Sequence, residues 1–531
     1  MKEKKKLKFK KFYFHPVTTF ILLTVGVIIM SGICSAFEMQ ATYNTVNVNT
    51  RELEPTLIVV ESLLNLNGIK YIFSNAMKTF LSFSPLGGII LALLAISIAE
   101  ATGFIETFTR RKLAKMPRYT LTFIIMFLSI SSSLLNDVGY VILIPLVALI
   151  YFINHRNPIF GIVTAYCGVA FGYGISIFVG SQEIALMEYT KKAAILIDKS
   201  AHIPLTSNLI FCIIATIIMS IIGTIILEKL IGPKIGKYKV SEEVANSEQY
   251  SVIDLEEVEQ QEIEKEKHEK SGLRAALIAT IIFGLIIIYA LIPNLPGSGL
   301  LLDMNEKIYV NQVFGPNAYL KNSCTYIVCI YLMIVSLIYG LFAKTLKSDK
   351  DLIDKINNRF SKAGGLFLTL FAASQFIAVY KKTNIGIIIT TWLGKILEYV
   401  EMDGVILIIA TLLIIALANI FLSSPTNKWI LLSPIVVPTF MQANISPEFA
   451  QIVMRVGNSM TNGISPILPA FALFIGYLNI YNLNKTKPIT IKQSLQMISP
   501  YFLLISITWI ILVIGWFMIG IPIGPKIFPT F

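Results

Sequence analysis

The chain has 531 residues, of which 55% are hydrophobic and only 14% are charged, and its mean hydropathy is +0.71. This composition excludes a soluble globular protein and indicates a polytopic membrane protein embedded in a lipid bilayer. The formal net charge of +12 does not indicate a nucleic-acid partner, because the Lys and Arg residues cluster at the ends of apolar segments, where they set membrane topology.

The first apolar run, residues 17–37, follows a lysine-rich N-terminus and predicts a retained membrane helix that leads out of the cytoplasm. Residues 38–80 then lie outside, and a second helix at 82–107 returns to a strongly basic cytoplasmic segment. We therefore treat residues 1–107 as one part, made of N-terminal helices and an outer segment.

Two later stretches each have two short apolar arms around a polar centre. The centre is Ser132-Ser133-Leu134-Leu135-Asn136 in residues 119–155 and Ser423-Ser424-Pro425-Thr426-Asn427 in residues 404–441. Basic residues flank the first stretch on both sides, whereas the segment after the second has no Lys or Arg. Because basic flanks mark the cytoplasmic side, we predict two re-entrant hairpins that enter the membrane from opposite faces.

Each hairpin is followed by an apolar segment that a small polar motif interrupts. The motif is Gly174-Ile175-Ser176 within residues 158–197 and Gly463-Ile464-Ser465 within residues 447–481. Unpaired backbone groups are too costly in lipid, so broken helices persist at membrane depth only where protein encloses a polar site. The pattern therefore predicts two inverted repeats, residues 108–232 and 346–482, with a substrate site between them at the midplane.

The segments between and after the repeats complete the predicted topology. Residues 233–272 are rich in charge and predict a cytoplasmic linker, residues 273–345 predict two connecting helices, and a last helix within residues 483–531 places the C-terminus outside. The predicted fold is an all-α polytopic membrane protein with nine transmembrane helices plus two oppositely oriented re-entrant hairpins. We expect it in the inner (cytoplasmic) membrane, with its N-terminus inside.

Polar residues at the hairpin tips and at the breaks are the first candidates for the site. Asn136, Asn427 and Ser424 offer oxygen and amide groups that can hydrogen-bond a ligand, and capping of short membrane helices is the alternative. The candidates at the breaks are Asn462 for substrate and Ser176 and Ser465 for a coupling ion.

Four charged residues lie within apolar segments, where each costs about 2.5 to 3.5 kcal/mol at a helix centre. Asp137 and Lys428 directly follow the two repeat asparagines, and we predict that they form an ion pair, with Asp137 also a candidate for ion coupling. For Lys428, attraction of an anionic substrate and a position near the interface are the alternatives. The other two charged residues are Glu183 and Arg455.

Arg455 has a planar fork of donors that suits a substrate carboxylate, and the alternative is a structural pair with a carboxylate of a hairpin. Glu183 lies just beyond the first break, where it can bind a coupling cation or exchange a proton, and simple exposure at a cavity mouth is the alternative. Trp429 offers a surface on which an aromatic ligand can stack, or else it anchors the chain at the membrane boundary.

The sequence lacks the motifs of soluble catalysis. It has neither a Gly-x4-Gly-Lys-[Ser/Thr] phosphate loop nor a His-Glu-x-x-His zinc motif, so we expect neither an enzyme nor direct drive by ATP. The remaining energy source is an ion gradient. We expect no cofactor, either proton or sodium as the coupling ion, and sodium, with unknown ligands, as the only metal.

Several motifs occur in an order that is similar to a known family. They lie at residues 15–18, 83–87, 98–100, 139–146, 383–386, 455–462 and 520–525. In this respect the chain resembles, nearly end to end, the AbgT family of p-aminobenzoyl-glutamate transporters. The resemblance implies a homodimer in which each subunit has nine helices and two opposed hairpins.

The resemblance also implies a function and a site. Uptake of the folate catabolite p-aminobenzoyl-glutamate and export of sulfonamide-type antimetabolites are the two implied activities, with Arg455 at a glutamate carboxylate and Trp429 at the aminobenzoyl ring. A transporter of another dicarboxylate is the runner-up, and a non-transporting membrane sensor or a channel is the alternative of a different class. The implied functional positions are Glu183, Asn419, Thr426, Trp429, Pro447 and Arg455.

Overall fold

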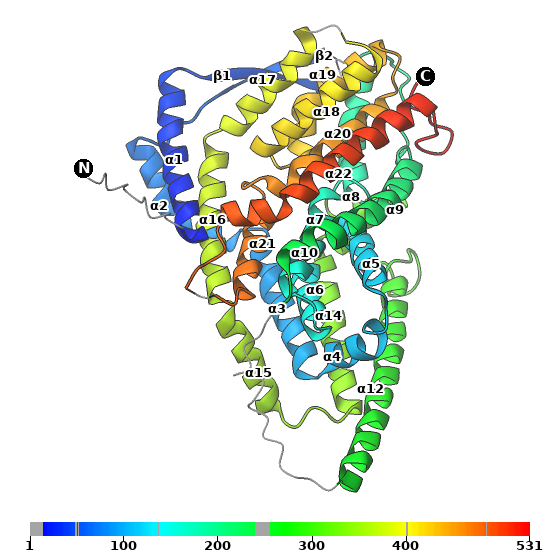
Figure 1. The fold of residues 1–531 in the computed structure, drawn as a ribbon. Coiled ribbons are helices and arrows are strands. Elements are labelled where there is room, and N and C mark those ends of the chain that lie inside the picture. Colours follow the sequence, from blue (N-terminus) through cyan, green and yellow to red (C-terminus); the bar gives the residue numbers. More distant parts are fainter. Residues whose placement is uncertain are drawn as a thin grey trace, which may run out of the picture.

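The computed structural model describes residues 14–47, 50, 52–135, 137–238, 255–399, 402–484 and 486–531 (Figure 1). In these residues nine helices are long and apolar enough to cross a membrane. The prediction of a helical polytopic membrane protein is therefore confirmed. The nine helices are Pro16–Ala36, Leu66–Ala101, Leu209–Ile235, Glu264–Ala290, Tyr319–Phe342, Gly364–Lys382, Gly404–Phe421, Pro447–Ile480 and Ile491–Ile519.

Eight of these nine helices coincide with predicted spans, which include spans predicted at residues 208–230 and 364–380, and one difference concerns the breaks. The predicted span at residues 158–197 is present as two shorter helices, α7 (Pro158–Phe171) and α8 (Ser181–Ala194), because the chain leaves the helical path between them. The ninth long helix is instead α18 (Gly404–Phe421), the first arm of the second hairpin.

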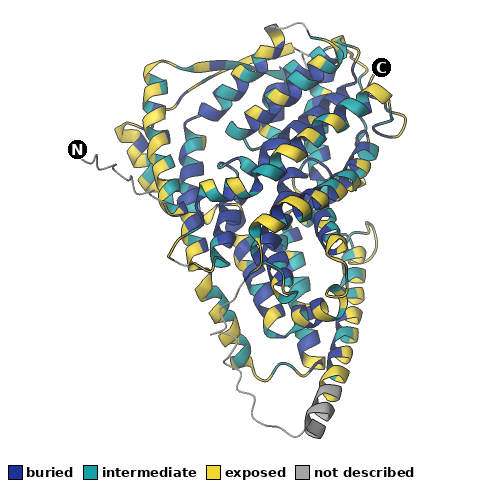
Figure 2. Cartoon of the chain, viewed as in Figure 1, coloured by how far each residue is buried: buried dark blue, intermediate teal, exposed yellow. Residues whose placement is uncertain are grey.

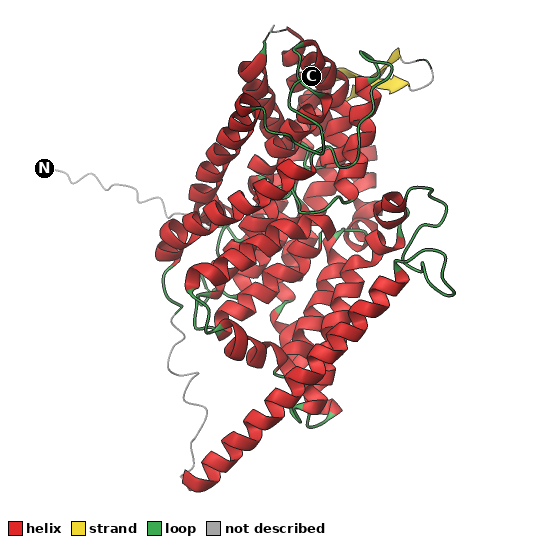
Figure 3. Ribbon diagram, turned by 90° about the vertical axis from the view of Figure 1, so that its right-hand side faces the viewer, coloured by secondary structure: helices red, strands yellow, loops and turns green. Residues whose placement is uncertain are grey.

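The N-terminal segment that was predicted to lie outside contains a feature that the sequence did not predict. After α1 (Pro16–Ala36), strands β1 (Gln40–Asn47) and β2 (Glu52–Val59) form a two-stranded antiparallel sheet, with Gln40 opposite Val59. Figure 3 shows these strands at one end of an otherwise helical molecule. The amphipathic helix α2 (Leu66–Leu81) follows and packs against α16 (Gly364–Lys382).

The first repeat contains the predicted hairpin as two helical arms. α3 (Pro85–Ala101) and the short α4 (Phe104–Phe108) lead to a basic π-helical turn, Thr109–Leu113, before the hairpin. The arms are α5 (Arg118–Ser131) and a π turn, Gly139–Leu143, that continues into α6 (Ile144–Ile153). After α7 and α8, the repeat ends with α9 (Leu209–Ile226), a π turn (Leu227–Ile231) and α10 (Gly232–Ile235).

The connecting region differs from its predicted boundaries. α12 (Leu255–Ala290) is one continuous helix, so the predicted boundary at residue 272 falls within a helix rather than at its start. The apolar part of α12 packs against α14 (Tyr319–Phe342), which follows the short α13 (Tyr309–Phe314). The charged helix α15 (Asp349–Lys362) then leads into the second repeat.

The second repeat has the same plan as the first. α16 and α17 (Ile385–Tyr399) precede the hairpin arms α18 and α19 (Pro425–Gln442). The broken span consists of α20 (Pro447–Thr461), a 3-10 turn (Asn462–Ile464) and α21 (Pro469–Ile480), and α22 (Ile491–Ile519) closes the chain. In Figure 1 the arms α18 and α19 lie in the upper half of the molecule and α5 and α6 in the lower half. The two hairpins therefore approach the centre from opposite ends.

The core lies along the broken helices at the centre (Figure 2). Every residue of α20 is buried, and α7 and α21 are nearly as fully enclosed. Such complete burial is unusual for a membrane helix, because one face normally contacts lipid. α20 is enclosed because α18, α19, α8 and α22 all pack around it.

Glycines hold each hairpin close to its broken helix in both repeats. Gly168 lies six residues before Gly174 of the first break, and Gly457 lies six residues before Gly463 of the second break. A Cβ at Gly168 would lie 2.5 Å from the Cβ of Ser129, and a Cβ at Gly457 would lie 2.9 Å from that of Ile415. These contacts let the backbones of the helices approach closely, as small residues do at membrane helix interfaces.

We expect Gly168→Ala and Gly457→Ala each to lower the free energy of unfolding by about 1 to 3 kcal/mol, because the added methyl group overpacks a tight contact. The unfolding temperature of the purified variants checks this result. Gly515→Ala is the matched control, because no atom lies within 4 Å of a Cβ at that position. Equal unfolding temperatures for all three variants would contradict the close approach.

Candidate functional site

The two hairpin tips meet at a cavity of about 160 Å³, which we call the central cavity. It is lined by residues of both hairpins, the two breaks and the start of α3, so the predicted convergence of tips and breaks is observed. The lining residues are Ser84, Pro85, Asp137, Tyr140, Val141, Tyr173, Ser423, Ser424, Pro425, Asn462, Leu468, Pro469 and Ala470.

Three predicted site residues, Asp137, Ser424 and Asn462, line this cavity. The hydroxyl of Ser84 donates a hydrogen bond to Oδ2 of Asp137 at 3.1 Å. Nδ2 of Asn462 donates to the hydroxyl of Tyr140 at 3.2 Å. Ser424 also accepts a hydrogen bond from the backbone N–H of Asn427 at 3.3 Å, so it caps α19, the alternative that the sequence had left open.

Arg455 and Glu183 form a buried ion pair beside the central cavity. Nη2 of Arg455, on α20, donates to Oε1 of Glu183, on α8, and the two side chains are only 3% and 10% exposed. Nε of Arg455 donates to the carbonyl of Gly174 at 2.5 Å, next to Tyr173 of the cavity lining. Arg455 is therefore held in a structural pair, but its partner lies on α8 and not on a hairpin.

The position of Arg455 is fixed by the first break. Glu183 accepts a second hydrogen bond, at 2.7 Å, from the backbone N–H of Gly180 just before α8. One guanidinium nitrogen, Nη1 of Arg455, is buried without a hydrogen-bond partner among the described residues. The pair thus ties α20 to the first break and leaves one charged donor that a further acceptor can satisfy.

The predicted ion pair between Asp137 and Lys428 is wrong. Nζ of Lys428 donates instead to Oδ1 of Asn419 and Oδ1 of Asn458, each at 2.5 Å. Lys428 lies in the first turn of α19, and its side chain extends to the last turns of α18 and α20, whereas Asp137 faces the central cavity. Lys428 is fully buried, so the alternative of a position near the interface is wrong as well.

Trp429 does not offer an open surface in this structure. Its side chain is fully buried, and Nε1 donates to the hydroxyl of Thr190, on α8, at 2.9 Å. Trp429 therefore helps to fix α19 against α8, and neither stacking on the central cavity nor anchoring at the membrane boundary is observed.

The other predicted residues do not line the central cavity. Ser176 donates to the carbonyl of Phe178 at 2.5 Å, within the first break, and Ser465 donates to the carbonyl of Ile420 at 3.2 Å, which joins the second break to the end of α18. Thr426 is half-buried, Asn427 is exposed, and Pro447 is the first residue of α20, two turns before Arg455. Asn136 lies outside the described residues.

The sequence analysis did not propose three polar residues of the lining, Ser84, Tyr140 and Tyr173, and it placed Ser423 only within the polar centre of the second hairpin. The rings of Tyr140 and Tyr173 lie with their centroids 6.2 Å apart in a stacked arrangement. Tyr173 lies between the two glycines of the first break, Gly172 and Gly174. This position could have identified it as a site residue, because a polar ring at a break indicates a polar site. Within the described residues, no group of three or more His, Cys, Asp or Glu side chains could hold a metal ion.

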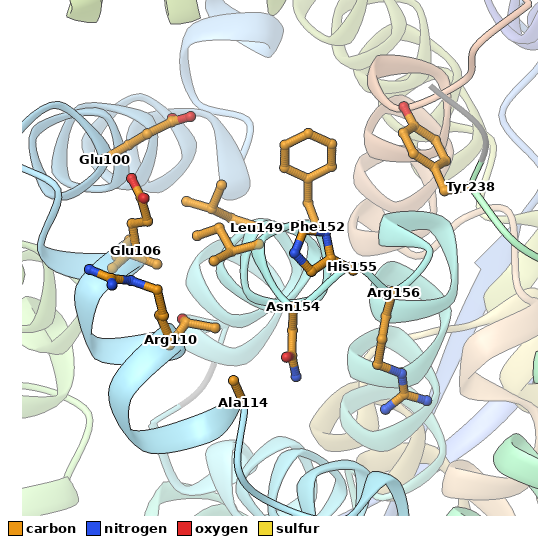
Figure 4. A pocket seen from close by; sticks show the side chains of 13 residues that line it. Glu100, Glu106, Arg110, Ala114, Leu149, Phe152, Asn154, His155, Arg156 and Tyr238 are labelled. Carbon is orange, nitrogen blue, oxygen red and sulfur yellow. The ribbon is translucent and has the colours of Figure 1, made fainter. Parts of the chain in front are cut away.

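Larger hollows lie toward the basic end of the molecule. One, of about 580 Å³, lies between Glu100, Glu106 and Arg110 on one side and Arg156 and Tyr238 on the other (Figure 4). A second, of about 440 Å³, shares several lining residues with the first and extends between α3 and α21. We call the two together the basic vestibule.

The basic vestibule and the central cavity lie along the same two helices. The central cavity is lined by Pro85 and Pro469, which are the first residues of α3 and α21. The basic vestibule is lined by Leu93 of α3 and Tyr477 of α21, and each lies eight residues further along its helix. Eight residues correspond to about 12 Å of helix. The vestibule therefore approaches the central cavity along α3 and α21 from the end that carries the basic segments.

Opposed hairpins whose tips meet a broken helix at a cavity that contains polar side chains define an inverted-repeat membrane transporter. The chain belongs to the AbgT putative transporter family, whose model matches residues 11–531. The resemblance seen in the sequence is thus confirmed over nearly the whole chain.

Three relatives illustrate this similarity. The p-aminobenzoyl-glutamate transport protein of Escherichia coli (strain K12) is 26% identical over 516 residues, which are 97% of this chain and 94% of that protein. The YdaH transporter of Alcanivorax borkumensis, whose crystal structure is described as revealing an unusual topology, is 25% identical, with a TM-score of 0.46 and coverage of 96% of this chain and 100% of that one. MtrF of Neisseria gonorrhoeae, whose structure is described as illuminating a class of antimetabolite efflux pumps, is 27% identical. Its TM-score is 0.47, and the match covers 97% of this chain and 98% of that one.

Proposed function

We propose that this protein is a secondary transporter of p-aminobenzoyl-glutamate or a related aromatic or dicarboxylate anion, driven by a proton or sodium gradient. The observation that carries the proposal is the central cavity, to which both hairpin tips and both breaks contribute. The name of the Escherichia coli relative supports the choice of substrate.

The chemistry of the central cavity fits such an anion. Tyr140 and Tyr173 provide aromatic faces for an aminobenzoyl ring. A carboxylate of the substrate would be recognised by Arg455, which bonds to Gly174 next to Tyr173 and has one free donor nitrogen. We propose that this carboxylate replaces Glu183 at the guanidinium during part of the cycle.

The size and charge of the central cavity suggest how transport is coupled. At about 160 Å³ it is smaller than the roughly 300 to 1,000 Å³ of typical ligand sites, so the hairpin tips must separate before substrate enters. Asp137 faces the same space, and two carboxylates in it repel each other. We therefore propose that a proton or a cation neutralises Asp137 when the anionic substrate binds.

Export of antimetabolites is a second candidate function, and the basic vestibule favours it. The vestibule lies at the end of the molecule that carries the basic segments, which we propose to be cytoplasmic by the positive-inside rule. A compound in the cytoplasm would thus have a route toward the central cavity. The description of MtrF supports this direction.

Three further features belong to the same proposal. We propose an inner-membrane location with the N-terminus inside and the C-terminus outside, because β1, β2 and the C-terminus lie at the end opposite the basic segments (Figure 1). We also propose a homodimer, on the strength of the family resemblance. The molecular mass of the purified protein in lipid nanodiscs tests the dimer, which would be twice 59.1 kDa.

The test of function is transport of radiolabelled p-aminobenzoyl-glutamate by the purified protein in proteoliposomes, under separate proton and sodium gradients. We expect saturable uptake driven by one of the two gradients. Outward transport of a sulfonamide with no uptake would favour the export function, and transport of another dicarboxylate alone would favour the runner-up. Absence of any flux would contradict a transporter and favour a membrane sensor.

A further inference from the structure

The side chain of Lys428 lies in a buried polar site between α18 and α20. Nζ of Lys428 lies 2.5 Å from Oδ1 of Asn419 and 2.5 Å from Oδ1 of Asn458. All three side chains are essentially inaccessible to solvent. Among the described residues, no carboxylate lies within 4.0 Å of this ammonium. A buried charge without a counter-ion is costly, so something else must compensate it.

The ends of two helices supply that compensation. Asn419 lies two residues before the end of α18, and Asn458 lies three residues before the end of α20. The C-terminus of a helix carries a partial negative charge of roughly half a unit, so two such ends together offset about one positive charge. Broken helices in transporters coordinate cations with their C-terminal ends in this way.

The orientation of Asn419 is fixed so that its oxygen faces the cation. Its Nδ2 donates to the carbonyl of Asn458 at 3.0 Å and to the hydroxyl of Thr461 at 3.2 Å, and that hydroxyl donates to the carbonyl of Ala416 at 2.7 Å. With the amide nitrogen occupied, Oδ1 is left to accept from Lys428. Residues of α18 and α20 thus form the site, and the Lys428 side chain that occupies it comes from α19.

We propose that the Lys428 ammonium is a resident cation between α18 and α20, in place of an alkali metal ion. It joins the tip of the second hairpin to the broken helix, and the native protein binds no sodium at this position. The proposal concerns the second hairpin alone and does not depend on which substrate is carried.

Lys428→Ala tests the proposal, because it empties the site and leaves two carbonyl oxygens and two helix ends facing a vacant space. The purified protein is unfolded by heat in rising NaCl or rising choline chloride. We expect the variant to be less stable than the wild type in choline and to regain several degrees of unfolding temperature with sodium, in a saturable way. This response to sodium should exceed any that the wild type shows.

Two controls accompany this measurement. Lys382→Ala removes a half-exposed lysine that pairs with Glu61, and its response to sodium should equal that of the wild type. Lys428→Met fills the space without a charge, and sodium should not restore its stability. A sodium response of the wild type as large as that of Lys428→Ala, or a folded Lys428→Ala protein with identical curves in both salts, would overturn the proposal.

If the Lys428→Ala protein does not fold, Asn458→Asp tests the proposal of a resident cation instead. It places a carboxylate against the ammonium, and a resident cation should then keep the unfolding temperature at or above that of the wild type, with no larger sodium response than the wild type shows. A fall in unfolding temperature that sodium reverses would show that the ammonium does not occupy this site as a cation.

Discussion

Glu183→Ala is expected to lower the free energy of unfolding by about 3 to 5 kcal/mol, because it leaves the Arg455 guanidinium buried without its counter-ion. The loss should appear as a much lower unfolding temperature in detergent and as less folded protein in the membrane. Uptake of p-aminobenzoyl-glutamate should fall at the same time, because Arg455 would lose one of the two groups that hold it beside the first break.

The double variant Glu183→Ala with Arg455→Met separates the loss of a charge pair from the loss of two side chains. Once both charges are removed, no uncompensated charge remains, so much of the lost stability should return while transport stays absent. Glu188→Ala is the matched control, since Glu188 lies on the same helix but pairs with Lys192 in a largely exposed position. A double variant that is less stable than either single variant would contradict the paired arrangement.

Asp137→Asn is expected to reduce gradient-driven accumulation of substrate by roughly 100-fold or more, a loss typical of removing a proton-transfer group. The amide keeps the shape of the side chain and can still bond to Ser84, but it cannot bind a proton or attract a cation. The measurement is uptake into proteoliposomes with an imposed gradient.

Substrate exchange without any gradient distinguishes coupling from binding. The Asp137→Asn protein should still exchange labelled for unlabelled substrate, because the neutral amide removes a repulsion from the central cavity. Asp198→Asn serves as the control, because Asp198 is exposed and bonds only within its own loop, to Ser200. Wild-type accumulation by Asp137→Asn would show that Asp137 does not carry the coupling.

Much of the architecture could be predicted because the bilayer constrains the sequence strongly. Long apolar runs, basic flanks and interrupted segments each have a direct physical meaning in lipid, and they led to the helices, the hairpins and the breaks. The two glycine motifs also indicated where the helices part, around Gly174 and Gly463. The β-hairpin at Gln40–Asn47 and Glu52–Val59 was not predicted, because it lies in a connection between apolar helices, where that constraint does not apply.

The partners of the charged residues could not be predicted in the same way. Symmetry of the two repeats suggested that Asp137 pairs with Lys428, but the directions of the side chains in three dimensions separate them. Glu183 and Arg455 are far apart in the sequence and meet only because α8 packs against α20. The tyrosines of the central cavity were missed because the prediction concentrated on charged and amide groups.

The most direct test of the central claim is to block the central cavity at the tip of the second hairpin. Ser423 lines the cavity, and the Ser423→Cys protein can be alkylated with N-ethylmaleimide, with wild type treated identically to correct for its five cysteines. Uptake of radiolabelled p-aminobenzoyl-glutamate is then measured before and after the reaction. We predict that substrate slows alkylation and that the alkylated protein does not transport, whereas undiminished uptake after complete alkylation would contradict the central cavity as the transport site.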